Sequence, residues 1–358
     1  MRRSRSSPQA PDPAEARARL LSWYRANRRD LPWRRTRDPY AIWISEAMLQ
    51  QTRVETVVGY WERFLARFPS VAALAEADED AVLAAWSGLG YYRRARALRA
   101  AAQAMVERHG GRFPDALDAA LDLPGVGPYT AGAVLSIAFD RGAALVDGNV
   151  VRVFARWFGC DLEYAAATRW AWKQAEQLVP REGGAGEWNQ ALMELGATVC
   201  TPERPRCAEC PLHDACVARA AGRQLELPRA KPRKRAVDVE LEALYVARGA
   251  ELLLERRPSE GRMADLWQLP TLQLSPEPEL ANLFPPRYSL MSLAADDEPL
   301  AVLRHSITHH RIVLRVHRAR APTEKQIEPL AWIPRARLGD LALGGMARKA
   351  LRALDSHQ

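Results

Sequence analysis

LPGVGPYTA, at residues 123–131, is the stretch that decides the fold of the first half of this chain. Its two glycines lie between two segments of helical pattern. Upstream, Phe113-Pro114-Asp115 opens a short helix. Downstream, apolar residues recur at positions i, i+3, i+4 and i+7, which is one face of a second helix, and these are Ala131, Val134, Leu135 and Ala138. The stretch therefore predicts a helix-hairpin-helix.

The hairpin between these helices is suited to holding a phosphate. Gly125 and Gly127 permit positive φ angles and lack Cβ atoms, so the backbone N–H groups from Gly125 through Val126 to Gly127 can approach an anion closely. We interpret these three residues as a contact to a nucleic-acid backbone that does not depend on base sequence. The glycine spacing alone leaves a second interpretation open, which is a tight turn that binds no ligand.

Length, charge and hydropathy limit the class of protein. With 358 residues the chain is long enough for two domains. Its 51 Lys and Arg residues exceed its 43 Asp and Glu residues, and the net charge of +8 suits a polyanionic partner without requiring one. No apolar run reaches the roughly 18 residues of a membrane span, and the N-terminus lacks the apolar core of a signal peptide. We expect a cytoplasmic protein, with organelle targeting by the N-terminal tail as the alternative.

Composition divides the chain into four regions. Residues 1–13 are rich in Arg, Ser and Pro, which predicts a disordered tail. Residues 14–222 are helical in pattern and predict an all-α domain. Residues 223–236 hold two prolines and a basic run, which predicts an exposed connector. From Val237 the apolar period changes to two, so residues 237–358 predict an α+β domain.

Four cysteines with the spacing C-x6-C-x2-C-x5-C close the helical region, and these are Cys200, Cys207, Cys210 and Cys216. Thiols so close together in a chain without a secretory signal predict a metal site more often than disulfides. Spacing alone does not decide between zinc and an iron–sulfur cluster. The loop between the first two cysteines carries Arg204 and Arg206 beside Pro202 and Pro205, which predicts a stiff basic contact to phosphate.

Several motifs together indicate a family, and these are WISEAMLQQT (43–52), GLGYYRRAR (88–96), LPGVGPYTA (123–131), VDGNVVRV (146–153) and the cysteine spacing. The chain resembles the endonuclease III superfamily of DNA glycosylases and, within it, the adenine DNA glycosylase (MutY) family. The resemblance implies a nucleoid-associated, monomeric enzyme. It would remove adenine mispaired with 8-oxoguanine or guanine in double-stranded DNA and hold a [4Fe-4S] cluster rather than zinc. Two alternatives stay open, namely a thymine- or uracil-mismatch glycosylase of the same superfamily and a catalytically silent DNA-binding protein.

Glu46 is the predicted general acid. Asp38-Pro39 is a helix start, with Asp as N-cap and Pro in the first turn, and Glu46 follows inside that helix among Trp43, Ile44 and Ala47. A carboxyl group in apolar surroundings has a raised pKa and holds its proton near neutral pH. A protonated Glu46 suits donation to N7 of adenine, a poor leaving group. The alternative is an exposed helical glutamate without a role.

Asp147, Asn149 and Tyr129 complete the predicted catalytic set. Asp147 precedes a helical pattern and is a predicted N-cap. The resemblance implies that an ionised Asp147 stabilises the developing sugar cation and helps position water, with Asn149 as its partner. Relatives that cleave the strand place a Lys where this chain has Tyr129, and a phenol cannot form an imine with the sugar. We therefore predict a monofunctional enzyme that leaves an abasic site.

The resemblance also implies residues that contact the substrate. Gln51 would enter the duplex from the minor groove, and Tyr91 would stack where the bases are separated. Leu31, Trp33 and Arg34 would line the adenine pocket. Arg93, Arg94 and Arg96 open a helix, where cations are unfavourable, which predicts an anion nearby. A solvated basic face beside a core tyrosine is the alternative for this segment.

Residues 252–270 (LLLERRPSEGRMADLWQLP) and 303–312 (LRHSITHHRI) resemble the MutT-like, Nudix-fold domain of adenine glycosylases. The glutamate-rich run that binds magnesium in hydrolases of that fold is missing from the sequence, so we do not expect nucleotide hydrolysis. The resemblance implies that Thr308 and His309 read the oxidised guanine. Ile307 replaces the usual aromatic residue of that loop, which removes a stacking surface there.

Overall fold

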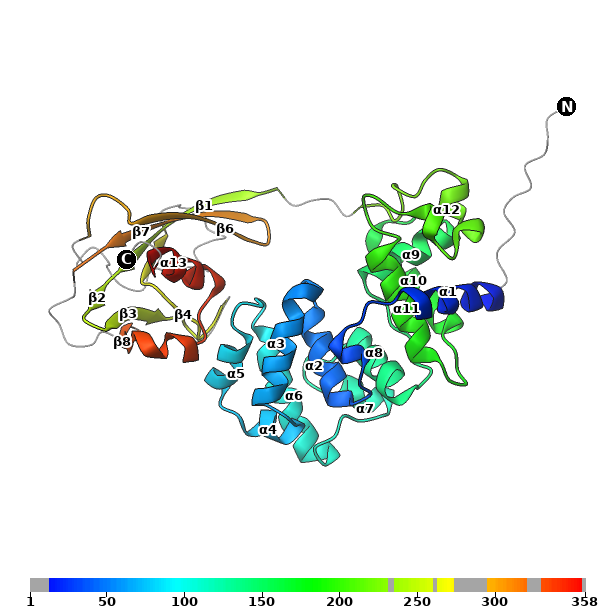
Figure 1. Cartoon of the computed structure of the whole chain (residues 1–358), viewed down its shortest axis with the longest axis horizontal. Coiled ribbons are helices and arrows are strands. Elements are labelled where there is room, and N and C mark those ends of the chain that lie inside the picture. Colours follow the sequence, from blue (N-terminus) through cyan, green and yellow to red (C-terminus); the bar gives the residue numbers. More distant parts are fainter. Residues whose placement is uncertain (1–12, 231–234, 260–262, 274–294, 321–329, 356–358) are drawn as a thin grey trace. The chain divides into compact units, whose positions relative to one another are not determined.

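The computed structural model describes residues 13–230, 235–259, 263–273, 295–320 and 330–355 (Figure 1). Contacts between residues divide the chain into two compact units. The first unit holds Met1–Trp61, Pro69–Ala75 and Ala100–Pro232, and the second holds Glu62–Phe68, Glu76–Arg99 and Arg233–Gln358. Two short helical segments therefore group with the C-terminal half of the chain. Residues 1–12 of the predicted tail lie outside the described residues.

The predicted all-α region is helical throughout. Its α-helices are α1 (Pro13–Asn27), α2 (Pro39–Leu49), α3 (Val54–Arg67), α4 (Val71–Glu76), α5 (Glu79–Trp86), α6 (Arg93–His109), α7 (Leu117–Leu121), α8 (Pro128–Phe139), α9 (Gly148–Phe158), α10 (Tyr164–Leu178), α11 (Ala185–Thr198) and α12 (Val217–Ala220). Short 3-10 turns lie at Pro32–Arg34 (η1), Cys207–Glu209 (η2) and His213–Ala215 (η3). In the described ranges, no helix combines the length and the apolar character that crossing a membrane requires.

The predicted helix-hairpin-helix is confirmed by α7, the turn after it, and α8. Gly125 has a φ of 72°, in the left-handed region, whereas Gly127 is the N-cap of α8 with a φ of −92°. Only the first glycine therefore needs its conformational freedom. Helix α8 is buried from Thr130 to Ser136, more than the one predicted face, because α2, α7 and α11 all pack against it.

The core of the first unit is built around α9. Its residues Val150, Val153, Phe154 and Trp157 follow the helical spacing of one face and are all buried. Side chains from α1, α8, α10 and α11 pack against this face in the same hydrophobic cluster. The start of α9 is thereby held firmly, and Asp147 lies at that start.

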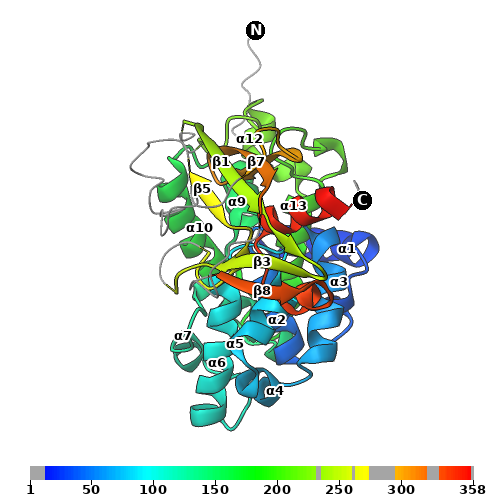
Figure 2. The ribbon, with the colours of Figure 1, turned by 90° about the vertical axis from the view of Figure 1, so that its left-hand side faces the viewer.

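The predicted α+β region is confirmed in the second unit. Its strands are β1 (Val237–Tyr245), β2 (Ala247–Arg248), β3 (Glu251–Arg256), β4 (Trp267–Gln268), β5 (Thr271–Gln273), β6 (Ala301–Ile307), β7 (His310–Arg318) and β8 (Leu330–Pro334). One sheet has the order β5-β1-β7-β6, with β1 parallel to β7 (Figure 2), and the other joins β2, β3 and β4, with β8 paired to β3. A 3-10 turn, η5 (Arg335–Asp340), and helix α13 (Gly345–Asp355) follow. Helix α13 lies between the two sheets in Figure 1 and contributes Met346, Ala350 and Leu354 to their common core.

The segment predicted as a connector is partly packed onto the first unit. Leu227 is buried, and its carbonyl accepts a hydrogen bond from Arg156 Nε at 3.0 Å. Arg223 and Arg229 both pair with Asp161. Residues 223–230 are therefore not a free linker, because an apolar side chain and two ion pairs hold them in place. Residues 231–234 lie outside the described residues.

Candidate active site

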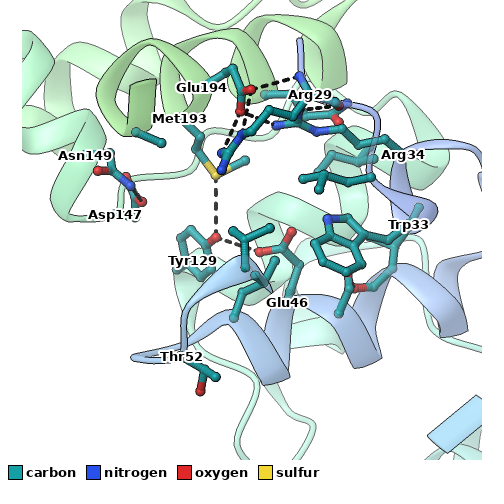
Figure 3. A pocket seen from close by; sticks show the side chains of 18 residues that line it. Arg29, Trp33, Arg34, Glu46, Thr52, Tyr129, Asp147, Asn149, Met193 and Glu194 are labelled. Atoms are coloured by element: carbon teal, nitrogen blue, oxygen red, sulfur yellow. Dashed lines mark hydrogen bonds and ion pairs between the residues drawn. The ribbon is translucent and has the colours of Figure 1, made fainter. Parts of the chain in front are cut away.

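Seven of the predicted site residues line one cavity of about 210 Å³ in the first unit (Figure 3). They are Leu31, Trp33, Arg34, Glu46, Tyr129, Asp147 and Asn149. They come from η1, α2, α8 and the start of α9, with α11 forming the remaining wall. The cavity is below the ~300–1,000 Å³ range of drug-sized ligand pockets and suits a single small ring system.

Glu46 and Tyr129 form the closest contact in this cavity. Helix α2 starts as predicted, since the Asp38 carboxylate accepts hydrogen bonds from Tyr40 N and Ala41 N, and it ends at Leu49. The helix thereby places Glu46 in the interior, where only 4% of the residue is exposed. The Tyr129 hydroxyl donates a hydrogen bond to Glu46 Oε2 at 2.6 Å. The exposed-glutamate alternative is therefore wrong.

Burial raises the pKa of Glu46 to about 7. The hydrogen bond from Tyr129 and the positive charge of Arg34 lower this pKa, while the negative charge of Asp147 raises it. The result places the proton on Glu46 for a substantial fraction of molecules at neutral pH. A carboxyl group that is both protonated and buried beside a cavity is suited to act as a general acid.

Asp147 is the N-cap of α9, as predicted. Its Oδ1 accepts a hydrogen bond from Val150 N and its Oδ2 accepts one from Asn149 Nδ2, both at 2.7 Å. Burial raises the pKa of Asp147 above its ordinary value, and these hydrogen bonds oppose that effect. Arg152 donates to Asn149 Oδ1 at 2.8 Å and to the Cys200 carbonyl at 2.7 Å. Asn149 is therefore held in place between Asp147 and Arg152.

A glycine on α11 makes room for Asn149. A Cβ atom at Gly196 would lie 2.5 Å from Asn149 Cβ, closer than carbon atoms approach. Only glycine at position 196 permits α11 to lie this close to the start of α9. The spacing of these two helices thus sets the position of the Asp147–Asn149 pair.

One wall of the cavity was not predicted. Glu194 on α11 is fully buried and accepts hydrogen bonds from Arg29 and Arg34 at 2.8–3.0 Å (Figure 3). Burial alone would raise the pKa of Glu194, but the two guanidinium groups outweigh it and lower the pKa to about 2. An ionised carboxylate with two arginines therefore faces Glu46 across the cavity. Gln190 and Met193 also line this wall.

The four predicted cysteines line a second, smaller cavity in the first unit, and all are free thiols. Arg156 lies beside them, almost fully buried, with Nη1 at 3.4 Å from Cys200 Sγ. Its other partners are the backbone carbonyls of Cys200, Thr201, Pro202 and Leu227. Cys160 lies outside this group and is half-buried.

Three of the residues predicted to contact DNA share an unusual backbone. Gln51, Tyr91 and Thr308 have φ angles of 60°, 48° and 55°, and all three are exposed. In the described ranges, six residues other than glycine have a positive φ. Such angles cost of order 1–3 kcal/mol each, most for a β-branched residue such as Thr308, and they concentrate at functional sites. The sequence does not reveal them, because none of these residue types prefers that region.

The other residues predicted to contact DNA differ in burial and in whether their side chains already pair with other residues of the protein. In the hairpin, the Val126 side chain is buried, so this residue offers only its backbone to a ligand. Arg204 is exposed, whereas Arg206 pairs with Glu209 at 2.7 Å. Arg94 lies over the rings of Trp86 and Tyr91, and Arg96 pairs with Glu79 and Asp265. The anion predicted beside Arg96 is thus supplied by the protein itself.

Thr308 lies at the tip of the hairpin between β6 and β7 in the second unit. Its hydroxyl donates to the Ile307 carbonyl at 2.7 Å and lies 3.4 Å from His309 Nδ1. Ile307 packs against the core of this unit, so its side chain faces inward. Thr308 is exposed at the tip and His309 is half-buried, and both remain predicted readers of a base.

Comparisons with known proteins agree with this geometry. Residues 44–179 match the family described as HhH-GPD superfamily base excision DNA repair protein, and residues 242–353 match the NUDIX domain. The chain is 33% identical to the adenine DNA glycosylase of Rattus norvegicus over 96% of this chain and 78% of the rat protein. It is 38% identical to that of Homo sapiens over 74% of this chain and 58% of the human protein.

A solved structure is also similar to part of this chain. A thermostable thymine-DNA glycosylase is 34% identical, with a TM-score of 0.54, over 58% of this chain and 97% of that one. The relatives from Rattus norvegicus and Mus musculus, which each match over 96% of this chain, are both adenine DNA glycosylases. With a helix-hairpin-helix domain, a Nudix-type domain and a buried acid in a small cavity, the chain belongs to the adenine DNA glycosylase family and is a DNA glycosylase that acts on adenine.

Proposed function

We propose that this enzyme removes adenine paired with 8-oxoguanine or guanine in double-stranded DNA and leaves an abasic site. The observation that carries this proposal is the 2.6 Å contact between Tyr129 and a buried Glu46 in a cavity that also holds Asp147. A base reaches such a cavity only after it leaves the helix stack. Adenine would lie between the Glu46 carboxyl group and the Asp147–Asn149 pair.

The carboxyl groups of Glu46 and Asp147 have different roles in the reaction. Glu46 donates its proton to the departing adenine, so the bond between C1′ and the base breaks toward an oxocarbenium ion. Asp147 is ionised and fixed by two hydrogen bonds, and it stabilises the positive charge that develops on the sugar. Water then adds to C1′ and gives up a proton to Asp147, and Glu46 takes up a new proton from solvent before the next turnover. Tyr129 positions Glu46, and because a phenol forms no imine, the strand stays intact.

The test of this function is a panel of duplexes. Single-turnover release should be fast for adenine opposite 8-oxoguanine and measurable for adenine opposite guanine, with no release of thymine or uracil from mispairs with guanine. Each product should show strand breaks only after alkali treatment. Release of thymine at a comparable rate would instead favour the thymine-glycosylase alternative, and release of no base would favour a silent DNA-binding protein.

The pH dependence of the chemical step should be bell-shaped. Glu46 must hold its proton, so the single-turnover rate should fall as the pH rises through about 7. Asp147 must be ionised, so the rate should also fall at low pH, at a pH above the ordinary range of an aspartate. Tyr129→Phe removes the hydrogen bond that lowers the pKa of Glu46, and it should move the alkaline limb to higher pH. A flat profile between pH 6 and 9 would contradict the role of Glu46.

We propose that the four cysteines hold a [4Fe-4S] cluster. All four thiols face one cavity, and Arg156 is a buried cation whose partners in the described residues are carbonyls and a thiol, without a carboxylate. A buried cation is costly unless an anion neutralises it, and ligating thiolates would do so. The resemblance to the endonuclease III superfamily favours a cluster over zinc. A bound cluster would supply iron–thiolate bonds that fix the loop carrying Arg204.

Replacing Cys207 with Ser should release iron and weaken binding to DNA together. The purified full-length protein is expected to be yellow-brown, with iron and acid-labile sulfide in equal amounts, and the variant should lose most of both. Cys160→Ser is the matched control, because this thiol lies outside the cavity and should leave the iron content unchanged. Stoichiometric zinc without visible absorbance, after expression with ample iron, would refute the cluster.

Replacing Thr308 with Ala should reduce the preference for 8-oxoguanine over guanine opposite adenine. We propose that the exposed hydroxyl at the hairpin tip bonds to the oxidised base, and one such contact is worth about 1–3 kcal/mol, or roughly 10- to 100-fold. The ratio of single-turnover rates on the two duplexes should fall, with little change in the rate opposite guanine. Val302→Ala, at an exposed position on the same hairpin, is the control. An unchanged ratio in Thr308→Ala would place lesion recognition elsewhere.

A further inference from the structure

The loop between α5 and α6 is held at both ends by one carbonyl group within the second unit. We call residues 87–92 the wedge loop. Ser87 Oγ donates to the Leu343 carbonyl at 2.6 Å, and Tyr92 OH donates to the same oxygen at 2.9 Å. Both donors are almost fully buried. Tyr92 OH also accepts a hydrogen bond from Gly88 N at 3.3 Å, which links the two ends of the loop.

The accepting carbonyl is itself fixed. Residues 342–344 bridge to β4, because Trp267 N donates to the Ala342 carbonyl at 2.9 Å and Gly344 N donates to the Trp267 carbonyl at 3.2 Å. The Leu343 side chain is buried in the core shared by the two sheets and α13. The wedge loop is hydrogen-bonded to this carbonyl group, and the Nudix-type fold therefore restrains the loop as well.

A second anchor lies on the first turn of α6. Arg96 donates to Glu79 Oε1 at 2.7 Å, to the Ala264 carbonyl at 2.7 Å and to Asp265 Oδ2 at 3.0 Å. The three partners join α5, α6 and the segment before β4. The wedge loop is thus fixed on two sides by residues far away in the sequence.

The residue that this loop presents is Tyr91. It is 44% exposed and lies between Gly90, with a φ of 70°, and the buried Tyr92, and its own φ is 48°. A left-handed tyrosine is unfavourable unless surrounding contacts enforce it. The hydrogen bonds at Ser87 and Tyr92 enforce it here, since they fix the residues on both sides of the turn.

We infer that Ser87 and Tyr92 are positioning residues for base extrusion. They tie Tyr91 to the C-terminal domain through the Leu343 carbonyl, so that domain supports separation of the bases as well as reading of the opposite base. The inference rests on the proposed function and on the contact with the duplex that the family resemblance implies for Tyr91. It gives the Nudix-type fold a mechanical role that does not depend on the identity of the opposite base.

The experiment compares Ser87→Ala, Tyr92→Phe and the double variant with the full-length wild type. Extrusion is followed by stopped-flow fluorescence of 2-aminopurine placed next to the target adenine. Loss of two buried hydrogen bonds should slow extrusion by about 5- to 30-fold in the double variant. The excision rate should fall by the same factor opposite guanine and opposite 8-oxoguanine. Affinity for a duplex with a tetrahydrofuran abasic analogue, whose base is already missing, should stay within about twofold.

A duplex that is easier to open distinguishes a positioning role of Ser87 and Tyr92 from a general loss of protein stability. Mismatches flanking the adenine lower the unstacking cost, and they should restore most of the lost rate in the double variant. An equal loss of rate in the double variant on the fully paired duplex and on the duplex with flanking mismatches would overturn the inference. Thr271→Val, which removes another hydroxyl bound to a backbone carbonyl in the same unit, should leave extrusion unchanged. Tyr92→Phe keeps the buried ring, so it remains an interpretable folded variant if the double variant unfolds.

Tyr91→Ala distinguishes this inference from the role proposed for Tyr91 itself. If Tyr91→Ala slows extrusion while Ser87→Ala, Tyr92→Phe and the double variant do not, the tyrosine acts as proposed and the anchoring through Leu343 is refuted. If Tyr91→Ala has no effect on extrusion, the contact of Tyr91 with the duplex is refuted, and the inference falls with it.

Discussion

Replacing Glu46 with Gln should lower the single-turnover rate of adenine release by about 10²- to 10⁴-fold, the usual contribution of general acid catalysis. The side chain keeps its size and can still accept the hydrogen bond from Tyr129. It cannot supply a proton of suitable acidity to a poor leaving group. The measurement is excision of adenine opposite 8-oxoguanine at saturating enzyme, with the affinity for an uncleavable adenine analogue measured in parallel.

The matched control for this variant is Glu176→Gln, which makes the same change at an exposed position of α10. It should leave both the rate and the affinity as in the wild type. In the Gln variant of position 46, affinity should survive and the alkaline limb of the pH profile should disappear. Wild-type excision by Glu46→Gln would falsify the assignment of the acid.

Replacing Asp147 with Asn is expected to be nearly as damaging. Asparagine is also a good N-cap, so the start of α9 should persist, but the negative charge that faces the sugar is lost. Removal of one preorganised electrostatic partner costs about 10²- to 10³-fold in rate. Asp38→Asn is the matched control, because Asp38 caps α2 in the same way without lining the cavity. A loss of stability shared by both variants, with equal rates, would show that Asp147 is only a helix cap.

Local sequence signals predict the helix starts and the apolar surroundings of the candidate catalytic residues, whereas their catalytic roles rest on the family resemblance. Asp38-Pro39 and Asp147 mark helix starts, and the residues around Glu46 are apolar enough to imply burial. Both signals concern neighbours in the chain, and the structure confirms them. The same holds for the alternation of β1 and for the helix-hairpin-helix.

What the sequence does not predict depends on contacts between distant residues. Glu194 reaches Arg29 across 165 positions, and Ser87 reaches Leu343 across 256. Neither residue type implies its partner, since a helical glutamate and a serine are ordinarily solvated. Leu227 shows the opposite error, because a basic, proline-containing stretch suggests exposure while one leucine in it is buried. The left-handed backbone of Tyr91 and Thr308 likewise follows from tertiary contacts that override local preference.

The wall formed by Glu194 has a consequence for how the enzyme responds to salt. Around the cavity, the guanidinium groups of Arg29 and Arg34 lie beside the ionised Glu194, and Glu46 carries its proton in a substantial fraction of molecules at neutral pH. Moving a proton from Glu46 to the base redistributes charge inside the cavity without changing the net charge of the cavity and the bound base together. Ionic strength therefore acts on the capture of DNA, where phosphates release counterions, and has little influence on bond cleavage once the base is enclosed.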